Sequence, residues 1–139
     1  MPPAQITVTR PLEWMDTDAA GIWHYSTTIR FVEHAELELH RQLRIVGVTF
    51  GKTPRARMEM DFRSSVRFGD DVTTTLTVAH VGRTSIVYGF TLETPRGLAA
   101  EGRIVTVLVG GDARPIEVPE DVRVALSAGT PRDADTATA

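Results

Sequence analysis

Two aspartates stand shortly before the longest helical pattern of the chain, in the segment that runs from Asp16 to Ser26. A helix N-terminus exposes free backbone N–H groups and carries about half a positive charge, so it polarises a carbonyl oxygen placed there. A carboxylate beside that carbonyl can attack it or activate a water molecule. The pattern therefore indicates acyl-transfer chemistry, with Asp16 and Asp18 as the candidate acids.

The same segment has two competing interpretations. Aspartate is frequent in turns because its side chain accepts hydrogen bonds from nearby backbone N–H groups, so either acid can be structural. The spacing of Asp16, Asp18 and Gly21 also fits positions 1, 3 and 6 of a calcium-binding EF-hand loop. That loop is excluded because Ala20 offers no side-chain oxygen at its position 5. Thr27 also occupies its position 12, where the motif requires glutamate. We predict no metal site.

The composition excludes several classes of function. The 139 residues include 15 Lys and Arg against 18 Asp and Glu, so no basic surface favours nucleic acid. No apolar run approaches the ~20 residues that cross a bilayer, and no glycine-rich loop indicates a nucleotide cofactor. The absence of cysteine excludes disulfides and thiolate chemistry. We expect a cytoplasmic protein that needs no cofactor and binds neither nucleic acid nor a membrane.

The hydrophobic pattern predicts one long helix and five strands. Apolar residues recur at helical spacing from Ile29 to Val46, with a Ser or Thr at 26–28 as the cap and Gly47 at the end. Alternating runs predict strands at 6–14, 56–68, 72–81, 84–94 and 98–109. Pro119 opens a short last helix.

These elements define the expected fold. Tight turns between the later strands exclude a parallel sheet, so we predict an α+β fold. Its five-stranded antiparallel sheet runs as a meander and wraps around one long central helix, with the Pro11-interrupted first strand at an edge or bulge. We expect a single domain over residues 1–128 and a disordered tail over residues 129–139.

Motifs spread over nearly the whole chain, to about Val124, resemble those of one family. The strongest comprises Asp16-x-Asp18-x-x-Gly21-Ile22, then Tyr25 and Glu33-x-Ala35. Weaker matches lie at 61–62, 69–70, 82–85 and 114–120. They are similar to the motifs of the 4-hydroxybenzoyl-CoA thioesterase family of hot-dog proteins. The resemblance implies a hot-dog fold and hydrolysis of the thioester bond of an acyl- or aroyl-CoA.

The resemblance also implies roles for two residues. Asp18 is the carboxylate that attacks the thioester or activates water, with Asp16 as its support. The backbone N–H of Tyr25 polarises the thioester carbonyl. Further substrate contacts are expected from His24 beside the loop and from acyl-pocket walls at Trp23, Phe31, Met58, Met60 and Phe62. Coenzyme A carries phosphates that need cationic partners, and Arg83 is the first candidate.

Several alternatives stay open at this point. An open sheet with uncovered edges favours pairing between copies, so we expect a homodimer or a homotetramer. A hot-dog enoyl-CoA hydratase or dehydratase that pairs His24 with Asp18 is one competing function, and a non-catalytic acyl-CoA-binding protein is another. The acyl group, the choice between coenzyme A and a carrier protein, and the choice between a mixed anhydride and activated water also stay open. Glu33 is expected to orient the dimer or the motif loop, or to form an ordinary salt bridge.

Overall fold

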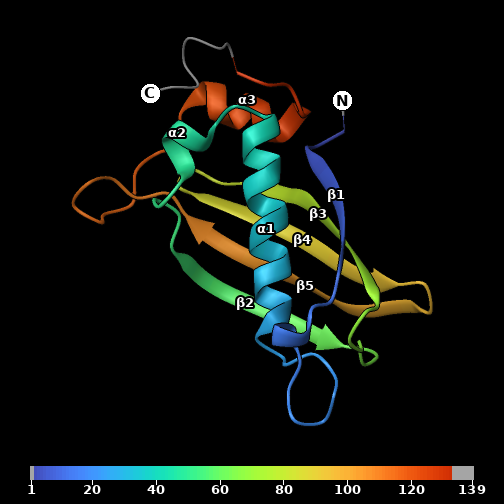
Figure 1. The fold of residues 1–139 in the computed structure, drawn as a ribbon. Coiled ribbons are helices and arrows are strands. Elements are labelled where there is room, and N and C mark those ends of the chain that lie inside the picture. The colour runs from blue at the N-terminus through green and yellow to red at the C-terminus, as the bar shows by residue number, and fades with distance from the viewer. Residues whose placement is uncertain (1, 133–139) are drawn as a thin grey trace.

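A five-stranded antiparallel sheet carries one long helix across a single face (Figure 1). The computed structural model describes residues 2–132. Its elements, in chain order, are β1 (Gln5–Pro11), a 3-10 turn η1 (Trp14–Asp16), α1 (Thr27–Gln42), α2 (Val46–Thr49), β2 (Arg55–Phe62), β3 (Asp71–Val81), β4 (Ser85–Thr94), β5 (Gly97–Val107) and α3 (Glu120–Ala128). The predicted α+β architecture is confirmed.

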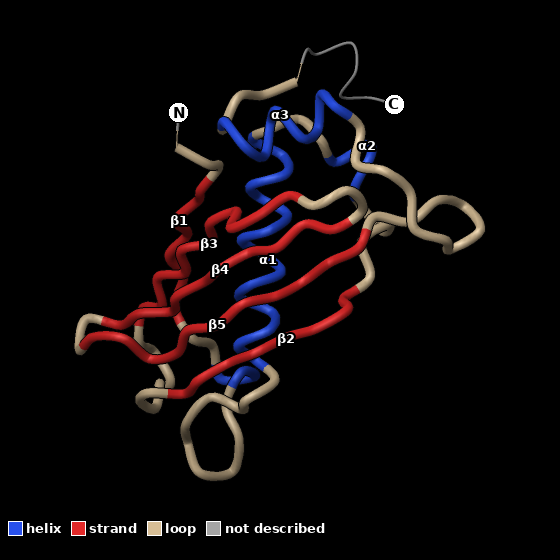
Figure 2. The backbone as a smooth tube through the Cα atoms, turned by 180° about the vertical axis from the view of Figure 1, so that it is seen from behind, coloured by secondary structure: helices blue, strands red, loops and turns tan. Residues whose placement is uncertain are grey.

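The strand order corrects the predicted meander. The order is β1-β3-β4-β5-β2, so β2 pairs with β5 rather than with β3, its neighbour in the chain. The hairpins β3–β4 and β4–β5 use both edges of β4, which leaves the outer edges of β3 and β5 for β1 and β2. Figure 2 shows β1 and β2 at opposite edges of the sheet. The edge position predicted for the first strand is confirmed.

Alternation along each strand separates a buried face from a polar one. Val72, Leu76 and Val78 of β3 point toward α1 and are buried. The other face, which no helix covers (Figure 2), carries Thr73, Thr75 and Thr77 of β3. Thr74 lies on the helix side and is buried. α1 buries Phe31, Val32, Ala35 and Leu39 against the sheet. The first turn of α1 lies near the end of β1 and the start of β3, where the motif segment enters.

Three predicted boundaries are wrong. The strand predicted over 6–14 ends at Pro11. α1 ends at Gln42 rather than near Gly47, because Arg44 adopts a left-handed conformation (φ 58°) that stops the helix. The strand predicted over 56–68 ends at Phe62. Beyond that point the chain leaves the sheet edge, and the backbone N–H groups of Arg63 and Ser64 both donate to the carbonyl of Ala99.

The C-terminal helix closes one end of the sheet. Pro119 is the N-cap of α3, and Gly129 ends the helix with a left-handed backbone (φ 66°). In the region of the predicted tail, Arg132 is buried and its guanidinium lies 2.7 Å from the carboxylate of Asp121. Residues 133–139 of that predicted tail lie outside the described residues. Among the described helices, none is long and apolar enough to cross a membrane.

Candidate functional site

The motif segment folds into a small hairpin that projects beyond the start of α1 (Figure 1). Thr17 and Trp23 form a β-bridge, and the N–H of Asp18 donates to the carbonyl of Ile22 at 2.9 Å. A turn closes the hairpin, because the N–H of Gly21 donates to the carbonyl of Asp18 at 3.0 Å. Gly21 takes a left-handed backbone there (φ 80°), which a glycine adopts without steric cost. The hairpin therefore carries Asp18 at its tip.

Asp16 anchors the base of this hairpin. Its side chain is 4% exposed, and it accepts hydrogen bonds from the N–H of Glu13 at 2.9 Å and from Arg30 at 3.2 Å. Arg10 lies 3.6 Å from the same carboxylate. The carbonyl of Asp16 accepts the N–H of His24 and the hydroxyl of Thr27. The first acid of the motif thus fixes the hairpin to the start of α1, in agreement with the supporting role predicted for it.

Asp18 has the opposite environment. Its side chain is exposed, and one carboxylate oxygen accepts the N–H of Ala20 at 2.8 Å. No ion pair to this carboxylate occurs within residues 2–132. Asp18 lines a cavity of about 540 Å³, the Asp18 cavity, whose walls also include Trp14, Thr17, Ala19, Gly21 and Phe68. An accessible carboxylate inside a cavity is the arrangement that nucleophilic or general-base chemistry needs.

The start of α1 offers a free donor. Ser26 is the N-cap of α1, one of the positions predicted for it, but its side chain makes no capping hydrogen bond. The Nδ1 of His24 accepts the N–H of Ser26 at 3.2 Å and lies 2.7 Å from the Ser26 hydroxyl. The neighbouring backbone N–H of Tyr25 donates to no acceptor in the described part of the chain. Tyr25 does not line the Asp18 cavity.

The other predicted substrate contacts are dispersed. Trp23 and Phe31 are 4% and 2% exposed and pack edge to face in the core, with the Arg10 guanidinium over the Phe31 ring. Met58 and Met60 are half-buried on the helix side of β2, and Phe62 at its end is 50% exposed. None of these residues lines the Asp18 cavity. Their contact with substrate stays a prediction.

Arg83 lies far from the motif hairpin within the subunit. It occupies the turn between β3 and β4, whereas the start of β3 at Asp71 lies beside Pro11 and the motif segment. Ten residue steps along β3 correspond to about 33 Å. The Arg83 guanidinium is exposed and lies 3.4 Å from Glu117. The structure therefore does not bring Arg83 and Asp18 together in one subunit.

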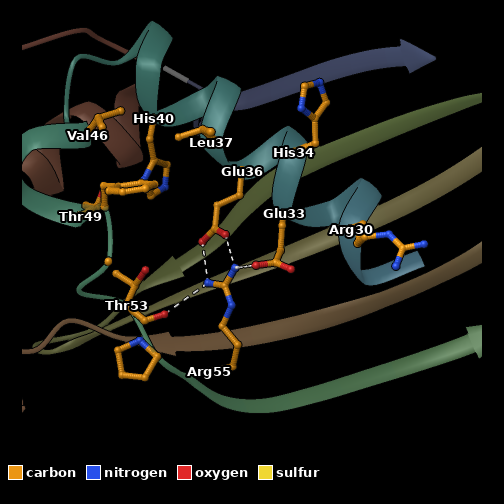
Figure 3. Close-up of a pocket in the computed structure, with 13 residues that line it drawn as sticks. Arg30, Glu33, His34, Glu36, Leu37, His40, Val46, Thr49, Thr53 and Arg55 are labelled. Atoms are coloured by element: carbon orange, nitrogen blue, oxygen red, sulfur yellow. Dashed lines mark hydrogen bonds and ion pairs between the residues drawn. The ribbon is translucent and has the colours of Figure 1, made fainter. Parts of the chain in front are cut away.

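A larger cavity of about 720 Å³, the α1–β2 cavity, lies between α1, α2 and the start of β2 (Figure 3). Arg55 forms a two-pronged pair with Glu36, whose side chain is only 10% exposed, and lies 3.7 Å from Glu33. Burial alone would lower the pKa of Arg55, but the hydrogen bond and the charge of Glu36 outweigh it and raise that pKa. Arg55 therefore neutralises Glu36, the buried one of the two carboxylates beside it.

A buried hydrogen-bonded chain forms the inner wall of the α1–β2 cavity. The hydroxyl of Thr49 donates to the carbonyl of Ile45, so it accepts from the Nδ1 of His40 at 2.6 Å. The Nε2 of His40 then accepts the hydroxyl of Tyr88 at 2.6 Å. Burial, aided by the charge of Arg55, lowers the pKa of His40 to about 4. Burial and the charge of Glu36 raise the pKa of Tyr88. Both side chains are therefore uncharged, and these hydrogen bonds fix their positions.

Sequence reasoning missed the aromatic walls of the Asp18 cavity. Trp14 and Phe68 were assigned to alternating strands, yet Trp14 lies in the turn η1 and Phe68 in the β2–β3 connection. One signal for Trp14 was available, since the exposed apolar pair Trp14-Met15 breaks strand alternation. Arg10 and Arg30 were also missed, because nothing in their spacing links them to Asp16.

Comparisons with known proteins agree with this fold. A family model described as the thioesterase superfamily matches residues 20–100. The structure of a predicted thioesterase from Bacillus stearothermophilus is 25% identical, with a TM-score of 0.81 over 94% of this chain and 100% of that one. A thioesterase from Thermus thermophilus, solved with coenzyme A and Zn, is 24% identical, with a TM-score of 0.78 over 88% of this chain and 97% of that one.

A mutant of 4-hydroxybenzoyl-CoA thioesterase, solved with 4-hydroxybenzoyl-CoA, is also 24% identical, with a TM-score of 0.78 over 89% of this chain and 99% of that one. These similarities extend over almost the whole length of each chain, and they confirm the predicted hot-dog fold. A search of curated protein sequences found no match.

Proposed function

The chain belongs to the thioesterase superfamily and is a thioester hydrolase, and from this premise we propose that Asp18 is its catalytic carboxylate and an acyl-CoA its substrate. The observation that carries the proposal is the environment of Asp18, exposed within a cavity and bonded only to the N–H of Ala20 in the described residues. Asp16, the other acid of the motif, is buried and paired with arginine, so it is unavailable for attack.

The proposed reaction uses groups that the chain already carries. The Asp18 carboxylate adds to the thioester carbonyl carbon or removes a proton from a water that adds to it. If Asp18 attacks, the carbon–sulfur bond breaks to leave a mixed anhydride on Asp18, which a water molecule hydrolyses to the carboxylic acid while the Asp18 carboxylate is regenerated. If water attacks, the same bond breaks to give the carboxylic acid directly. In both cases the leaving thiolate takes up a proton that comes from the water and leaves as the thiol. No cofactor is needed for this sequence of steps. A mixed anhydride and directly activated water both use Asp18 in the same place.

The carbonyl oxygen must be stabilised as charge develops on it. We assign this role to the backbone N–H of Tyr25, which has no acceptor in the described residues and lies at the positive end of α1. One such donor is typically worth about 10²- to 10³-fold in rate. A substrate bound between the hairpin tip and the helix start would use both groups.

Coenzyme A is supported as the carrier by the relatives. The Thermus thermophilus thioesterase was solved with coenzyme A, and 4-hydroxybenzoyl-CoA thioesterase with 4-hydroxybenzoyl-CoA. The alternative of a hydratase or dehydratase has less support, because His24 would have to act as its base. The Nδ1 of His24 already accepts the N–H of Ser26 at the helix start.

We further propose that the protein is a homodimer joined through β2. This strand is a sheet edge of eight residues, and its outer row of backbone N–H and C=O groups has no partner strand in the described chain. Such an edge favours strand pairing with another copy. A monomer mass by light scattering at micromolar concentration would contradict this. Pairing of dimers into a tetramer is the further outcome that the same measurement detects.

The function is tested by replacing Asp18 with Asn. Asparagine keeps the hydrogen bond from the Ala20 N–H but cannot attack or take a proton, so hydrolysis should fall about 10²-fold or more. Thiol release from a panel of aryl, short and long acyl-CoAs measures the loss, and circular dichroism verifies the fold.

Asp112→Asn is the matched control, because Asp112 is also an exposed loop acid that accepts the N–H of the second residue after it. Its activity should equal that of the unmodified protein. Full hydrolysis by Asp18→Asn, with the fold retained, would show that another group performs the chemistry.

A further inference from the structure

Two exposed aromatic side chains line the cavity that contains Asp18. Trp14 is 80% exposed and Phe68 is 65% exposed. Neither ring packs against another aromatic ring within residues 2–132. Large aromatic surfaces that stay in water around a polar group mark a site that buries them on binding. Their ring faces are therefore available to a ligand held at Asp18.

The backbones that carry these rings are fixed to one another. The N–H of Leu12, just before η1, donates to the carbonyl of Asp70 at 2.8 Å, and the N–H of Gly69 returns a bond to Leu12 at 3.0 Å. Gly69 follows Phe68 directly, so these two bonds hold the Trp14 and Phe68 segments side by side. The cavity is therefore preorganised, which lowers the entropic cost of binding.

The Phe68 segment is braced from two further directions. The N–H of Trp23 donates to the carbonyl of Val66 at 2.8 Å, which joins the hairpin of Asp18 to the same segment. Asp70 accepts the N–H of Arg67 and forms a two-pronged pair with Arg96. These hydrogen bonds hold the pKa of Asp70 down at about 2, so the brace is charged at neutral pH.

The lining of the Asp18 cavity selects one end of an acyl-CoA. Its six residues are Trp14, Thr17, Asp18, Ala19, Gly21 and Phe68, which include one carboxylate and no cation. The nucleotide end of coenzyme A carries phosphates, which need cationic or N–H partners and are repelled by a carboxylate. The uncharged acyl end is not repelled by the carboxylate of Asp18. A volume of about 540 Å³ is within the usual range for a small-molecule site.

We propose that Trp14 and Phe68 form the acyl-group site of this enzyme and that they select planar aromatic acyl groups over straight saturated chains. The proposal rests on the catalytic role of Asp18 proposed above. A planar ring gains stacked or edge-on contacts with both walls, whereas a saturated chain gains only the burial of its surface. The small side chains of Ala19 and Gly21 leave room for the ring beside the carboxylate.

The first test measures selectivity. Trp14→Leu and Phe68→Leu keep an apolar wall but remove a ring, and each is assayed for thiol release from benzoyl-CoA and hexanoyl-CoA. The unmodified protein should favour benzoyl-CoA in kcat/KM. Each substitution should reduce that preference by about 3- to 10-fold, mainly through the benzoyl value. Phe50→Leu is the matched control, since Phe50 is 69% exposed and lines the other cavity.

The second test measures binding without turnover. The chain has two tryptophans, and Trp23 is 4% exposed, so the emission that responds to solvent comes from Trp14. In the Asp18→Asn protein, benzoyl-CoA should shift this emission to shorter wavelength, and coenzyme A alone should not. The shift should disappear in Asp18→Asn combined with Trp14→Phe, which retains only Trp23.

The outcomes separate this proposal from the one it rests on. If Asp18→Asn is inactive but both leucine variants keep the preference of the unmodified protein, the acyl-group site is wrong and the catalytic role of Asp18 stands. An unmodified protein without preference for benzoyl-CoA also overturns the site. Equal loss with both substrates, accompanied by a change in oligomeric mass, would show that the rings contact a second copy of the chain instead.

Discussion

The Asp18 cavity and the α1–β2 cavity differ in how their charges are neutralised. The first has about 540 Å³ and one exposed carboxylate, bonded to a single backbone N–H. The second has about 720 Å³, and its buried Glu36 is paired with Arg55. Volume alone would select the second cavity as the reactive site. The carboxylate of Asp18, which has no cation partner in the described residues, makes the first cavity the better candidate.

Burial explains this difference. A carboxylate withdrawn from water is stable only when it is paired and hydrogen-bonded, and a paired carboxylate is a poor base or nucleophile. In the α1–β2 cavity the pair joins α1 to the first residue of β2. Asp18 lies on a projecting hairpin, where its carboxylate is exposed to water and has no ion pair within residues 2–132. The pair in the larger cavity therefore holds elements together, whereas the carboxylate of the smaller cavity has no cation partner within residues 2–132.

The sharpest test of this contrast replaces each of the two acids, Glu36 and Asp18, by its amide in a separate variant. Glu36→Gln removes the charge in the larger cavity, and kcat/KM should stay within about 3-fold because Glu36 takes no part in chemistry. Asp18→Asn should lose about 10²-fold or more. Both are assayed by thiol release on folded protein. If the ranking were reversed, the chemistry would belong to the α1–β2 cavity.

The stabilising role of the Glu36–Arg55 pair predicts the next effect. Arg55→Met leaves the buried Glu36 without its cation, so the free energy of unfolding should fall by about 2–4 kcal/mol. The loss is smaller than for a fully buried pair because Arg55 is partly exposed. Urea unfolding monitored by circular dichroism measures it. Arg57→Met is the control, because Arg57 pairs with Glu59 at the exposed face of β2. A loss as large in the control would remove the distinction between the two pairs.

The buried histidine predicts a smaller, pH-dependent effect. The pKa of His40 in the folded protein is about 4, below the ordinary value of 6.5, so the unfolded chain binds a proton that the folded protein does not. Stability should be unaffected above pH 6.5 and should fall as the pH drops toward 4, by about 2 kcal/mol between pH 7 and pH 5. Urea unfolding at both pH values measures the decrease.

His40→Gln should remove this pH dependence while lowering stability at pH 7, since glutamine does not titrate. His34→Gln serves as the comparison, because His34 is an exposed residue of α1. An unchanged slope in His40→Gln would mean that another group causes the acid destabilisation.

The sequence predicted the elements of this fold better than their ends and neighbours. Alternation identified β3, β4 and β5, because each has one face toward α1 and one toward solvent. It failed beyond Phe62, where the apolar residues Val66 and Phe68 still alternate although the chain has left the sheet. Pairing of β2 with β5 was also missed, because alternation specifies faces and not neighbours.

In the candidate site, too, local patterns predicted some features and missed those that depend on contacts between distant segments. The motif identified both acids, and the family resemblance predicted catalysis by Asp18 and support by Asp16. The structure buries Asp16 at the base of the hairpin. The partners of Asp16 come from β1 and from the first turn of α1, and no local pattern connects them. The contact of His24 with Ser26 was missed for a similar reason, since the bend before α1 brings its ring back to the Ser26 N–H.

The sequence by itself determined the family, the number of strands, the single long helix and the two acids of the motif, because these depend on residue order and local periodicity. Only the tertiary structure decided which acid is free, since that depends on arginines that folding brings to Asp16. It also decided that Trp14 and Phe68, 54 positions apart in the chain, share a cavity with Asp18. Charge pairing and cavity walls are properties of distances in space, which residue order does not specify.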